Sequence, residues 1–336
     1  MSTLTIALPD DYVLARDLCS YGYFLLEPNR WNPGRHEFTT TLDIGDAAVT
    51  VRVVQRSGQA RRARRGAGAF PAGGRLVVRA DRALDAAGRR EVRARLVRIL
   101  RLDEPPEAIR EFHRLDPRFA ASGRGRLMRS ASLFEDVIKT VTSCNVTWPS
   151  TVNMNRRLCE VFGRRSASGL FAFPTSACLS RARPASLRAR CSVGYRDARI
   201  VELAGIFEAA RRGRASVFDP VLAESSELGD ESLFKALQEL PGIGPYAAAN
   251  ILQLLGRYSR LPLDTESVRH GRKVLGYTGS SAQVMRRLHA HYEPFGEHRF
   301  RSYWFELWEY YEAKRGLSWT WERETTGRTF TAALLD

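Results

Sequence analysis

Cysteine is scarce in this chain of 336 residues, and its few copies lie far apart. Their number is odd, no two of them form a CxxC pair, and none follows residue 191. This pattern argues against a disulfide framework and against a zinc site, and it fits a reducing compartment such as the cytoplasm. The five cysteines are Cys19, Cys144, Cys159, Cys178 and Cys191.

Long apolar runs are also missing. No stretch of about 18 consecutive apolar residues occurs, so we expect no membrane-spanning helix and no membrane partner. The stretch MSTLTIALPDDYVLARD contains neither a basic region nor a cleavage pattern, so we expect no secretory leader. Together with the cysteine pattern, these absences predict a cytoplasmic protein.

Acidic residues are few relative to basic ones. The chain has 37 Asp and Glu against 52 Lys and Arg, which gives a formal net charge of +15. An excess of this size favours a polyanionic partner, most often nucleic acid. Only four of the basic residues are lysines, however, and an arginine-rich composition is also typical of GC-rich genomes. The charge therefore gives mild support to nucleic-acid binding.

The first hundred residues have the character of a β-sheet. Residues 36–55 are rich in β-branched side chains and contain the turn IGD, which predicts two strands joined by a hairpin, and residues 75–80 predict another strand. Residues 56–74 are rich in Arg, Gly and Ala, and we expect a mobile, solvated loop there. Residues 85–106 predict a helix that ends before two prolines.

Apolar residues at helical spacing dominate after about residue 105. The predicted fold class is therefore α+β, with an N-terminal antiparallel sheet followed by an all-helical body. We predict a β-rich domain over residues 1–105, a helical domain over 106–320 and a C-terminal tail over 321–336. The predicted helices lie within residues 130–146, 151–163, 195–213, 231–256, 265–277, 282–292 and 299–316.

The most distinctive stretch is LPGIGPYAAANI, residues 240–251. Helical segments precede and follow it, and Pro245 occupies the favoured first turn of the second helix. Gly242 and Gly244 permit positive φ angles and a close approach of another backbone. Because a helix N-terminus presents free N–H groups and a positive dipole end, a DNA phosphate can bind there. A plain tight turn between two helices is the alternative, and this motif alone does not separate the two.

Asp264 stands at the predicted start of the next helix, shortly after this hairpin. It fits an N-cap that accepts a hydrogen bond from the N–H of Ser267. A carboxylate fixed in this way can stabilise an oxocarbenium-like sugar or orient a water molecule onto it. Glu266, in the first turn of the same helix, suits the helix dipole; a second carboxylate near a pocket is the alternative for this residue.

The hairpin and the segment LPLDTESVRHGRKVLG that follows it together resemble the helix-hairpin-helix DNA glycosylases, which have a Gly/Pro-rich loop and an essential aspartate. The resemblance implies an enzyme of base excision repair that flips a damaged base out of the duplex and cleaves its N-glycosidic bond. It also implies that Asp264 is catalytic. The amides around Gly242, Ile243 and Gly244 would then bind phosphates of the lesion strand.

Two further segments are similar to the 8-oxoguanine/3-methyladenine branch of these glycosylases. FEDVIKTVTSCNVTWPSTVNMNRRLCEVFG resembles its helix, polar turn and helix, which implies that Asn145 lies at the gap in the DNA. GYRDARIVELA resembles its wedge element, which implies that Tyr195 fills the space of the flipped base and that Arg196 contacts the estranged partner base. Core packing of Tyr195 and a solvated helix start at Arg196 are the alternatives.

The resemblance also implies where the base pocket lies. SYGYFLLEPNRW is similar to the β domain of that branch, which implies that Gly22 and Tyr23 lie near the pocket. The aromatic residues of 299–316 form one pocket wall in the resembled enzymes, which places Tyr303 and Trp304 there; core packing is the alternative. We find no glutamine in this stretch of the kind that the oxoguanine enzymes use, and aromatic faces suit an electron-poor alkylated purine.

Tyr246 stands where bifunctional members carry a lysine that attacks the sugar and forms a Schiff base. The resemblance therefore implies an enzyme without lyase activity, with Tyr246 in the base pocket. Iron–sulfur relatives need four closely spaced C-terminal cysteines, which this chain lacks. No organic cofactor and no metal bound by side chains are expected, although the resemblance suggests a monovalent cation on the hairpin carbonyls.

The sequence thus predicts a monomeric, monofunctional DNA glycosylase in the cytoplasm, associated with the nucleoid. Its partner would be double-stranded DNA that contains a damaged base, and the predicted lesion is an alkylated purine. Two alternatives stay open. One is an 8-oxoguanine DNA glycosylase without the lyase lysine, and the other is a non-catalytic protein that binds DNA lesions on the same scaffold.

Overall fold

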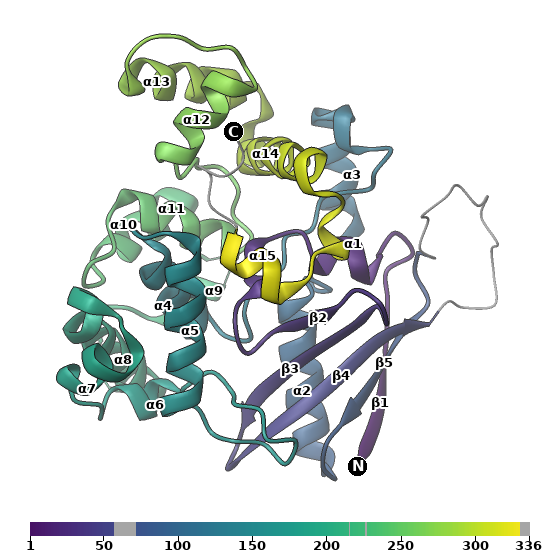
Figure 1. Ribbon diagram of the computed structural model, residues 1–336, viewed down its shortest axis with the longest axis vertical. Helices are drawn as coiled ribbons and strands as arrows, with labels where there is room; N and C mark the ends of the chain where they lie inside the picture. The colour runs from purple at the N-terminus through teal and green to yellow at the C-terminus, as the bar shows by residue number, and fades with distance from the viewer. Residues whose placement is uncertain (57–71, 215, 226, 330–336) are drawn as a thin grey trace.

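The computed structural model describes residues 1–56, 72–214, 216–225 and 227–329. An antiparallel sheet and a larger helical body form the molecule (Figure 1), so the predicted α+β fold class is confirmed. The arginine-rich loop predicted over 56–74 lies almost entirely outside the described residues. Within those residues, no helix combines the length and the apolar character needed to cross a membrane.

Five antiparallel strands form the sheet, in the order β1-β5-β4-β3-β2. The predicted hairpin is confirmed: β3 and β4 pair with Leu42 opposite Val49, and Gly45 has a φ of +59° in the turn between them. Alternate side chains of β4 point inward, where Val51 and Val53 are fully buried. The prediction missed the strands β1 and β2. The strands are β1 (Ser2–Ala7), β2 (Arg30–Asn32), β3 (Glu37–Ile44), β4 (Ala47–Arg56) and β5 (Arg75–Ala80).

Helix α2 (Ala86–Ile99) covers the inner face of the sheet. Its buried side chains recur every three or four residues and share a core with the inward-facing valines of β4. The helix ends before the two prolines, as predicted. Shorter elements complete this half of the molecule: α1 (Leu14–Leu18), the 3-10 turn η1 (Gly22–Leu25), α3 (Pro106–Leu115) and η2 (Pro117–Phe119).

A second hydrophobic core lies inside the helices that follow. The hairpin helices α10 and α11 pack on each other there, and α11 also packs on α4. The predicted helices of this region are confirmed, whereas α6, α7 and α9 were not predicted. The elements are α4 (Leu133–Ser143), α5 (Trp148–Phe162), α6 (Ser176–Leu179), α7 (Pro184–Cys191), η3 (Gly194–Arg196), α8 (Asp197–Arg211), α9 (Pro220–Glu224), α10 (Asp230–Gln238) and α11 (Pro245–Leu254).

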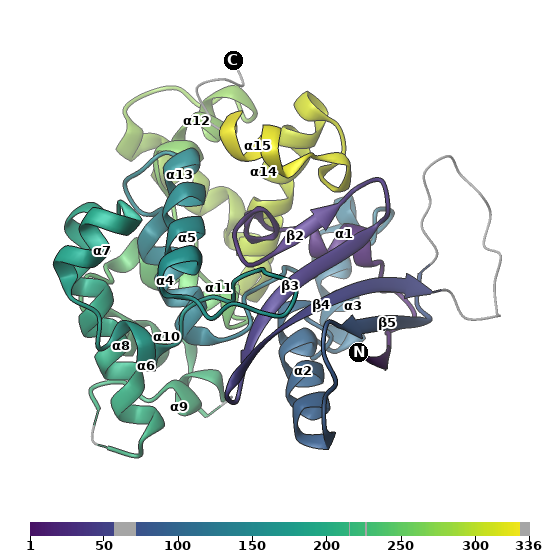
Figure 2. The ribbon, with the colours of Figure 1, turned by 60° about the horizontal axis from the view of Figure 1, so that its bottom comes forward.

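The last helices, α14 and α15, return to the sheet-bearing side of the molecule, near β2 and α1 (Figure 2). Aromatic side chains of α14 belong to the same core as the sheet, so this first core joins the two ends of the chain. The division into 1–105, 106–320 and 321–336 stays a prediction. The last elements are α12 (Thr265–Lys273), α13 (Ser281–Tyr292), η4 (Glu293–His298), α14 (Arg299–Arg315), η5 (Ser318–Thr320) and α15 (Arg323–Thr329).

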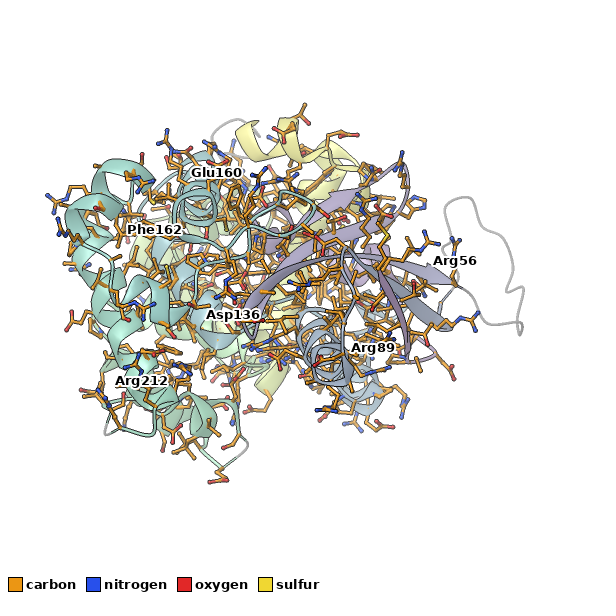
Figure 3. The ribbon with its side chains drawn as sticks, turned by 90° about the horizontal axis from the view of Figure 1, so that it is seen from below. Arg56, Arg89, Asp136, Glu160, Phe162 and Arg212 are labelled. Atoms are coloured by element: carbon orange, nitrogen blue, oxygen red, sulfur yellow. The ribbon has the colours of Figure 1, made fainter. Side chains whose placement is uncertain are left out.

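An ion pair between buried groups connects the two halves. Arg98 on α2 lies 2.8 Å from the carboxylate of Asp136 on α4, and Asp136 is fully buried. Figure 3 shows Asp136 in the middle of the molecule, between Arg89 on the sheet side and Arg212 on the helical side. Asp136 also accepts a hydrogen bond from the N–H of Ser130, at 2.8 Å. Helix α4 is therefore held to the sheet side near its N-terminus.

Candidate active site

The loop between α10 and α11 is a tight turn with little side chain on its surface. Gly242 has a φ of +75°, and Gly244 is the extended N-cap residue of α11. Both glycines are exposed. Ile243 between them points into the second core, and its N–H is bonded to the carbonyl of Leu240. The hairpin therefore presents the backbone of its two glycines, and the side chain of Ile243 fixes the turn to the core.

Asp264 caps the N-terminus of α12, as the sequence predicts. Its Oδ1 atom accepts hydrogen bonds from the N–H of Ser267 at 3.0 Å and from the Ser267 hydroxyl at 3.1 Å. The N–H of Asp264 donates in return to Ser267 Oγ, which completes a capping box. This arrangement fixes the direction of the carboxylate relative to the helix.

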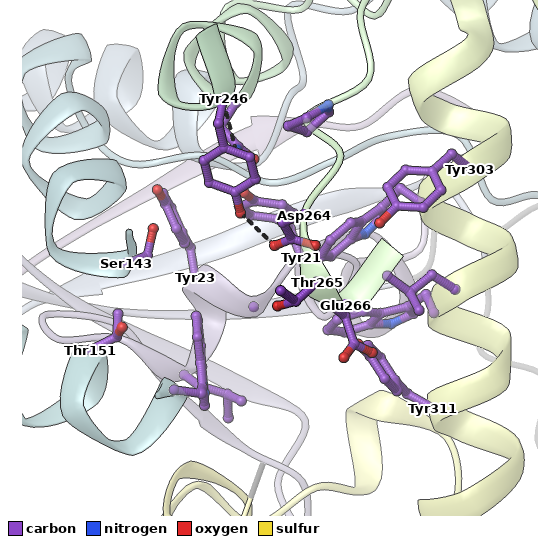
Figure 4. A pocket seen from close by; sticks show the side chains of 18 of the residues that line it. Tyr21, Tyr23, Ser143, Thr151, Tyr246, Asp264, Thr265, Glu266, Tyr303 and Tyr311 are labelled. Carbon is purple, nitrogen blue, oxygen red and sulfur yellow. Dashed lines mark hydrogen bonds between the residues drawn. The ribbon is translucent and has the colours of Figure 1, made fainter. Parts of the chain in front are cut away.

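Two tyrosines complete the surroundings of Asp264. The phenol of Tyr246 donates to Asp264 Oδ2 at 3.0 Å (Figure 4). Tyr303 Oη lies 2.7 Å from Ser267 Oγ, and since the Ser267 hydroxyl donates to Asp264, the phenol of Tyr303 is the donor. Burial and the Asp264 carboxylate raise the pKa of both phenols. Both therefore stay protonated at neutral pH and act as hydrogen-bond donors.

Asp264 faces a cavity of about 420 Å³, whose apolar lining belongs mostly to the first hydrophobic core. This volume is within the range of about 300–1,000 Å³ that is typical of small-molecule sites. All of the residues that the sequence assigned to a base pocket line it. Those residues are Gly22, Tyr23, Tyr246, Tyr303 and Trp304.

Several lining residues were missed by the sequence analysis. Trp148, at the start of α5, packs directly on η1: a Cβ atom on Gly22 would lie 2.9 Å from its indole ring. Tyr21 packs on Trp304 with the ring centres 4.8 Å apart. The sequence could have identified Trp148 as a cavity residue from its position, because it is a tryptophan next to the predicted polar turn. The full set is Tyr21, Gly22, Tyr23, Leu25, Ser143, Val146, Thr147, Trp148, Thr151, Tyr246, Asn250, Pro262, Asp264, Thr265, Glu266, Phe300, Tyr303, Trp304, Leu307, Trp308 and Tyr311.

Asn145 and Tyr195 lie exposed outside this cavity. Asn145 occupies the turn between α4 and α5 with a φ of +53°, in the left-handed region that asparagine tolerates. Tyr195, on η3, leaves 56% of its surface exposed, which is high for a large aromatic side chain. Core packing of Tyr195 is therefore excluded, and both side chains are available to a partner.

Arg196 lies neither where it could contact a partner base nor at a solvated helix start, which were the two expectations for it. Its guanidinium is buried rather than solvated, and it donates to the carbonyls of Val141, at 3.0 Å, and of Cys144. These are carbonyls at the C-terminal end of α4, so Arg196 holds the Asn145 turn in place. Contact with a partner base, which the resemblance implied, would require this guanidinium to leave its present partners.

Arg199, three residues further along the chain on α8, is exposed. Its guanidinium lies over the ring of Tyr195, 5.5 Å from the ring centre. A Cβ atom on Gly242 would lie 2.7 Å from Arg199 Cδ, so the arginine packs against the hairpin. The sequence analysis did not single it out, because nothing local indicates that α8 meets the hairpin.

His270 does not line the cavity. His270 is fully buried, and its Nε2 atom is 2.8 Å from the carboxylate of Glu306, which agrees with a structural role. Across the ranges that the structure describes, no three His, Cys, Asp or Glu side chains are gathered closely enough to hold a metal ion.

Comparison with family models gave no match, and comparison with curated protein sequences gave none either. Solved structures do match over nearly the whole chain. The 3-methyladenine DNA glycosylase from Archaeoglobus fulgidus superposes with a TM-score of 0.65 at 23% identity, and the match covers 92% of this chain and 98% of that one.

Two further solved structures are also similar. The 8-oxoguanine glycosylase/lyase from Clostridium acetobutylicum, in its apo form, gives a TM-score of 0.63 at 16% identity, covering 91% of this chain and 96% of that one. MBOgg1, solved with a low-affinity DNA ligand, gives 0.65 at 15% identity, covering 94% and 97%. At these identities the likeness concerns the fold. The predicted likeness is confirmed for the fold: the chain has the fold of these DNA glycosylases.

Proposed function

We propose that this protein is a monofunctional DNA glycosylase of base excision repair, which hydrolyses the N-glycosidic bond of an alkylated purine in double-stranded DNA. The observation that carries the proposal is the position of Asp264. Its carboxylate is oriented by Ser267 and Tyr246 at the wall of an aromatic cavity of about 420 Å³. A flipped base fills the cavity, and its sugar lies against the carboxylate.

The phosphate backbone would be held by the hairpin. In this proposal the backbone amides of the exposed Gly242 and Gly244 and the N-terminus of α11 bind a phosphate, with the Arg199 side chain packed beside Gly242. Tyr195 and Asn145 are exposed, and in this proposal they act as a wedge that fills the gap left by the flipped base. We also propose that a monovalent cation binds to the hairpin carbonyls.

Bond cleavage then needs little acid catalysis. As the C1′–N bond breaks, its electrons leave with the base, and an N-alkylated purine that carried a positive charge departs as a neutral molecule. The carboxylate of Asp264 stabilises the oxocarbenium-like sugar, and water adds to C1′ and loses its proton. The products are a free base and an abasic site.

Two features support the absence of lyase chemistry and the choice of lesion. Tyr246 occupies the lysine position, and a protonated phenol forms no Schiff base with C1′. Among the residues that the structure describes, the cavity lining contains two carboxylates and many aromatic rings but no lysine, arginine, histidine or glutamine. Such a lining suits an electron-poor or cationic base better than 8-oxoguanine.

The test is an excision assay on duplexes that contain 3-methyladenine-type, hypoxanthine, uracil or 8-oxoguanine lesions. Each reaction is analysed with and without hot alkali, beside the Asp264→Asn variant. Strand breaks that need alkali and disappear in the variant support the proposal and identify the lesion. Strand breaks without alkali would mean that the protein carries a lyase nucleophile elsewhere. Excision confined to 8-oxoguanine would overturn the proposed substrate, and tight binding without any product would favour a non-catalytic lesion-binding protein.

A further inference from the structure

A second carboxylate enters the cavity beside Asp264. Glu266 lies two residues further along α12 and also lines the cavity. In Figure 4 its carboxylate points away from Asp264, toward Tyr311 on α14. The two carboxylates therefore occupy different parts of the same cavity, and only Asp264 is bonded to Tyr246.

Two side chains fix the direction of the Glu266 carboxylate. Arg269 donates from Nε to Oε2 at 3.0 Å and from a second nitrogen to Oε1, and the phenol of Tyr311 also donates to Oε1. A carboxylate offers about four acceptor positions, so roughly one remains for a ligand. Tyr311 is buried, and burial raises the pKa of its phenol, as does the Glu266 carboxylate.

Arg269 does not reach the cavity. Of the described residues that line the cavity, none is a lysine, arginine or histidine, so the carboxylate is the end of the Glu266–Arg269 pair that faces a bound base. Rings of Tyr303 and Trp304 close part of the same space. In such a partly buried site, opposite charges at contact distance attract several times more strongly than in water.

We propose that Glu266 is a specificity-determining residue that selects bases carrying a positive charge over neutral ones. This inference rests on the proposed function, in that the cavity receives a flipped base. Glu266 acts on binding and positioning of the charged ring, whereas Asp264 acts on the sugar. A purine methylated on N7 or N3 is held by its charge as well as by stacking, and a neutral purine of similar size is held by stacking alone.

The first test compares two lesions in the same duplex: 7-methylguanine, which is cationic, and hypoxanthine, which is neutral. Single-turnover excision is measured for the unchanged protein and for Glu266→Gln, which keeps the size of the side chain and removes its charge. The ratio of the two rates should fall at least about tenfold, equivalent to about 1.4 kcal/mol. Arg269→Gln, which leaves the carboxylate less neutralised, should move the ratio the other way.

Tyr311→Phe provides the matched control. It removes one hydrogen bond to Glu266 and keeps the charge, so the ratio should change much less than in Glu266→Gln. Melting temperatures of all variants separate folding from selectivity. If Glu266→Gln lowers both rates equally, or leaves the ratio unchanged in a folded protein, the residue is only a helix-stabilising acid and the proposal is wrong.

A second measurement does not need catalysis. Trp148, Trp304 and Trp308 line the cavity, so their fluorescence reports a free base that enters it. The probes are 7,9-dimethyladeninium and 9-methyladenine, which differ by one methyl group and one charge. Preference for the cation, lost in Glu266→Gln, supports the inference even if no lesion is excised, in which case the proposed function alone fails. Equal binding of the two probes, or binding of neither, would overturn it.

Discussion

Tyr246 and Asp264 belong to the first turns of two different helices, α11 and α12, and a single hydrogen bond of 3.0 Å joins them. Tyr246 thus brings the hairpin and the carboxylate into one rigid unit. Under the proposed function, its phenol stands where bifunctional glycosylases carry a basic side chain that attacks the sugar.

Replacing Tyr246 by lysine should therefore add a nucleophile to the site. The amine would lie beside the Asp264 carboxylate and attack C1′, so that a Schiff base forms and borohydride traps the protein on DNA. The measurement is a trapped band on a gel with a lesion duplex. Tyr246→Gln is the control, since it is polar but not nucleophilic. No trapped product from a folded Tyr246→Lys variant would contradict the proposed position of the sugar.

Asp264 combines a structural and a chemical function, and two substitutions separate them. Asparagine also serves as an N-cap, so Asp264→Asn should change the free energy of unfolding by less than about 1 kcal/mol, whereas Asp264→Ala should cost about 1–2 kcal/mol. Both should abolish excision, and the asparagine variant should still bind DNA. Urea denaturation, a binding titration and single-turnover kinetics measure the three quantities.

Ser280→Ala is the matched control for the cap. Ser280 closes a similar capping box on α13 and does not line the cavity. It should lower stability to a similar degree as Asp264→Ala and leave excision intact. Excision that survives in Asp264→Asn would remove the carboxylate from the proposed mechanism.

Substitution of Arg196 should lower the stability of the protein, whereas substitution of Arg199 should lower its affinity for DNA. Arg196→Ala removes charge-assisted hydrogen bonds to buried carbonyls, which should cost about 2–3 kcal/mol of stability. Arg199→Ala changes an exposed side chain and should cost less than about 0.5 kcal/mol. If Arg199 contacts one phosphate, its loss should weaken DNA binding and reduce the log–log salt slope by about 0.9. A stable Arg196→Ala variant would contradict its role in holding the Asn145 turn.

Glu306 makes a specific contribution to stability against acid. Burial opposes ionisation of this carboxylate, but hydrogen bonds from His270, Tyr292 and Arg118 outweigh burial and lower its pKa from 4.5 to about 2. Because the folded-state pKa is the lower one, the stabilisation is present above about pH 4.5 and is lost as the pH falls toward 2. With allowance for solvent screening, about 1–2 kcal/mol should disappear by pH 3.

Urea unfolding at pH 5 and pH 3 measures this contribution as a difference between the unchanged protein and Glu306→Gln. The variant should be less stable at pH 5 and should lose less stability on acidification. Glu202→Gln, on the exposed surface of α8, is the control and should follow the unchanged protein. Parallel pH profiles for Glu306→Gln and the unchanged protein would contradict the assignment.

The sequence predicted best those features that depend on neighbouring residues. The turn at Gly242 and Gly244 and the cap at Asp264 follow from local backbone preferences, and both were found as expected. The β3–β4 hairpin was predicted for the same reason. Strand β1 shows the expected alternation of buried and exposed residues, but six residues without a turn signal were not recognised.

The remaining parts of the site depend on contacts between distant segments. Trp148 meets Gly22 across more than a hundred residues of sequence, and Tyr311 meets Glu266 only because α14 returns to α12. Arg196 was expected at the surface, yet the short turn η3 directs it inward to the end of α4. No local pattern encodes such contacts, so the composition of the cavity wall required the structure.

Helix α4 is anchored at both ends by arginines that come from opposite sides of the molecule. Arg98 from the sheet side binds Asp136 in its first turn, and Arg196 binds the carbonyls at its other end. Eleven residues of helix span about 16 Å. These contacts fix the distance between the Arg98–Asp136 ion pair and the Asn145 turn, so the position of that turn depends on α2 as well as on η3, which carries Arg196.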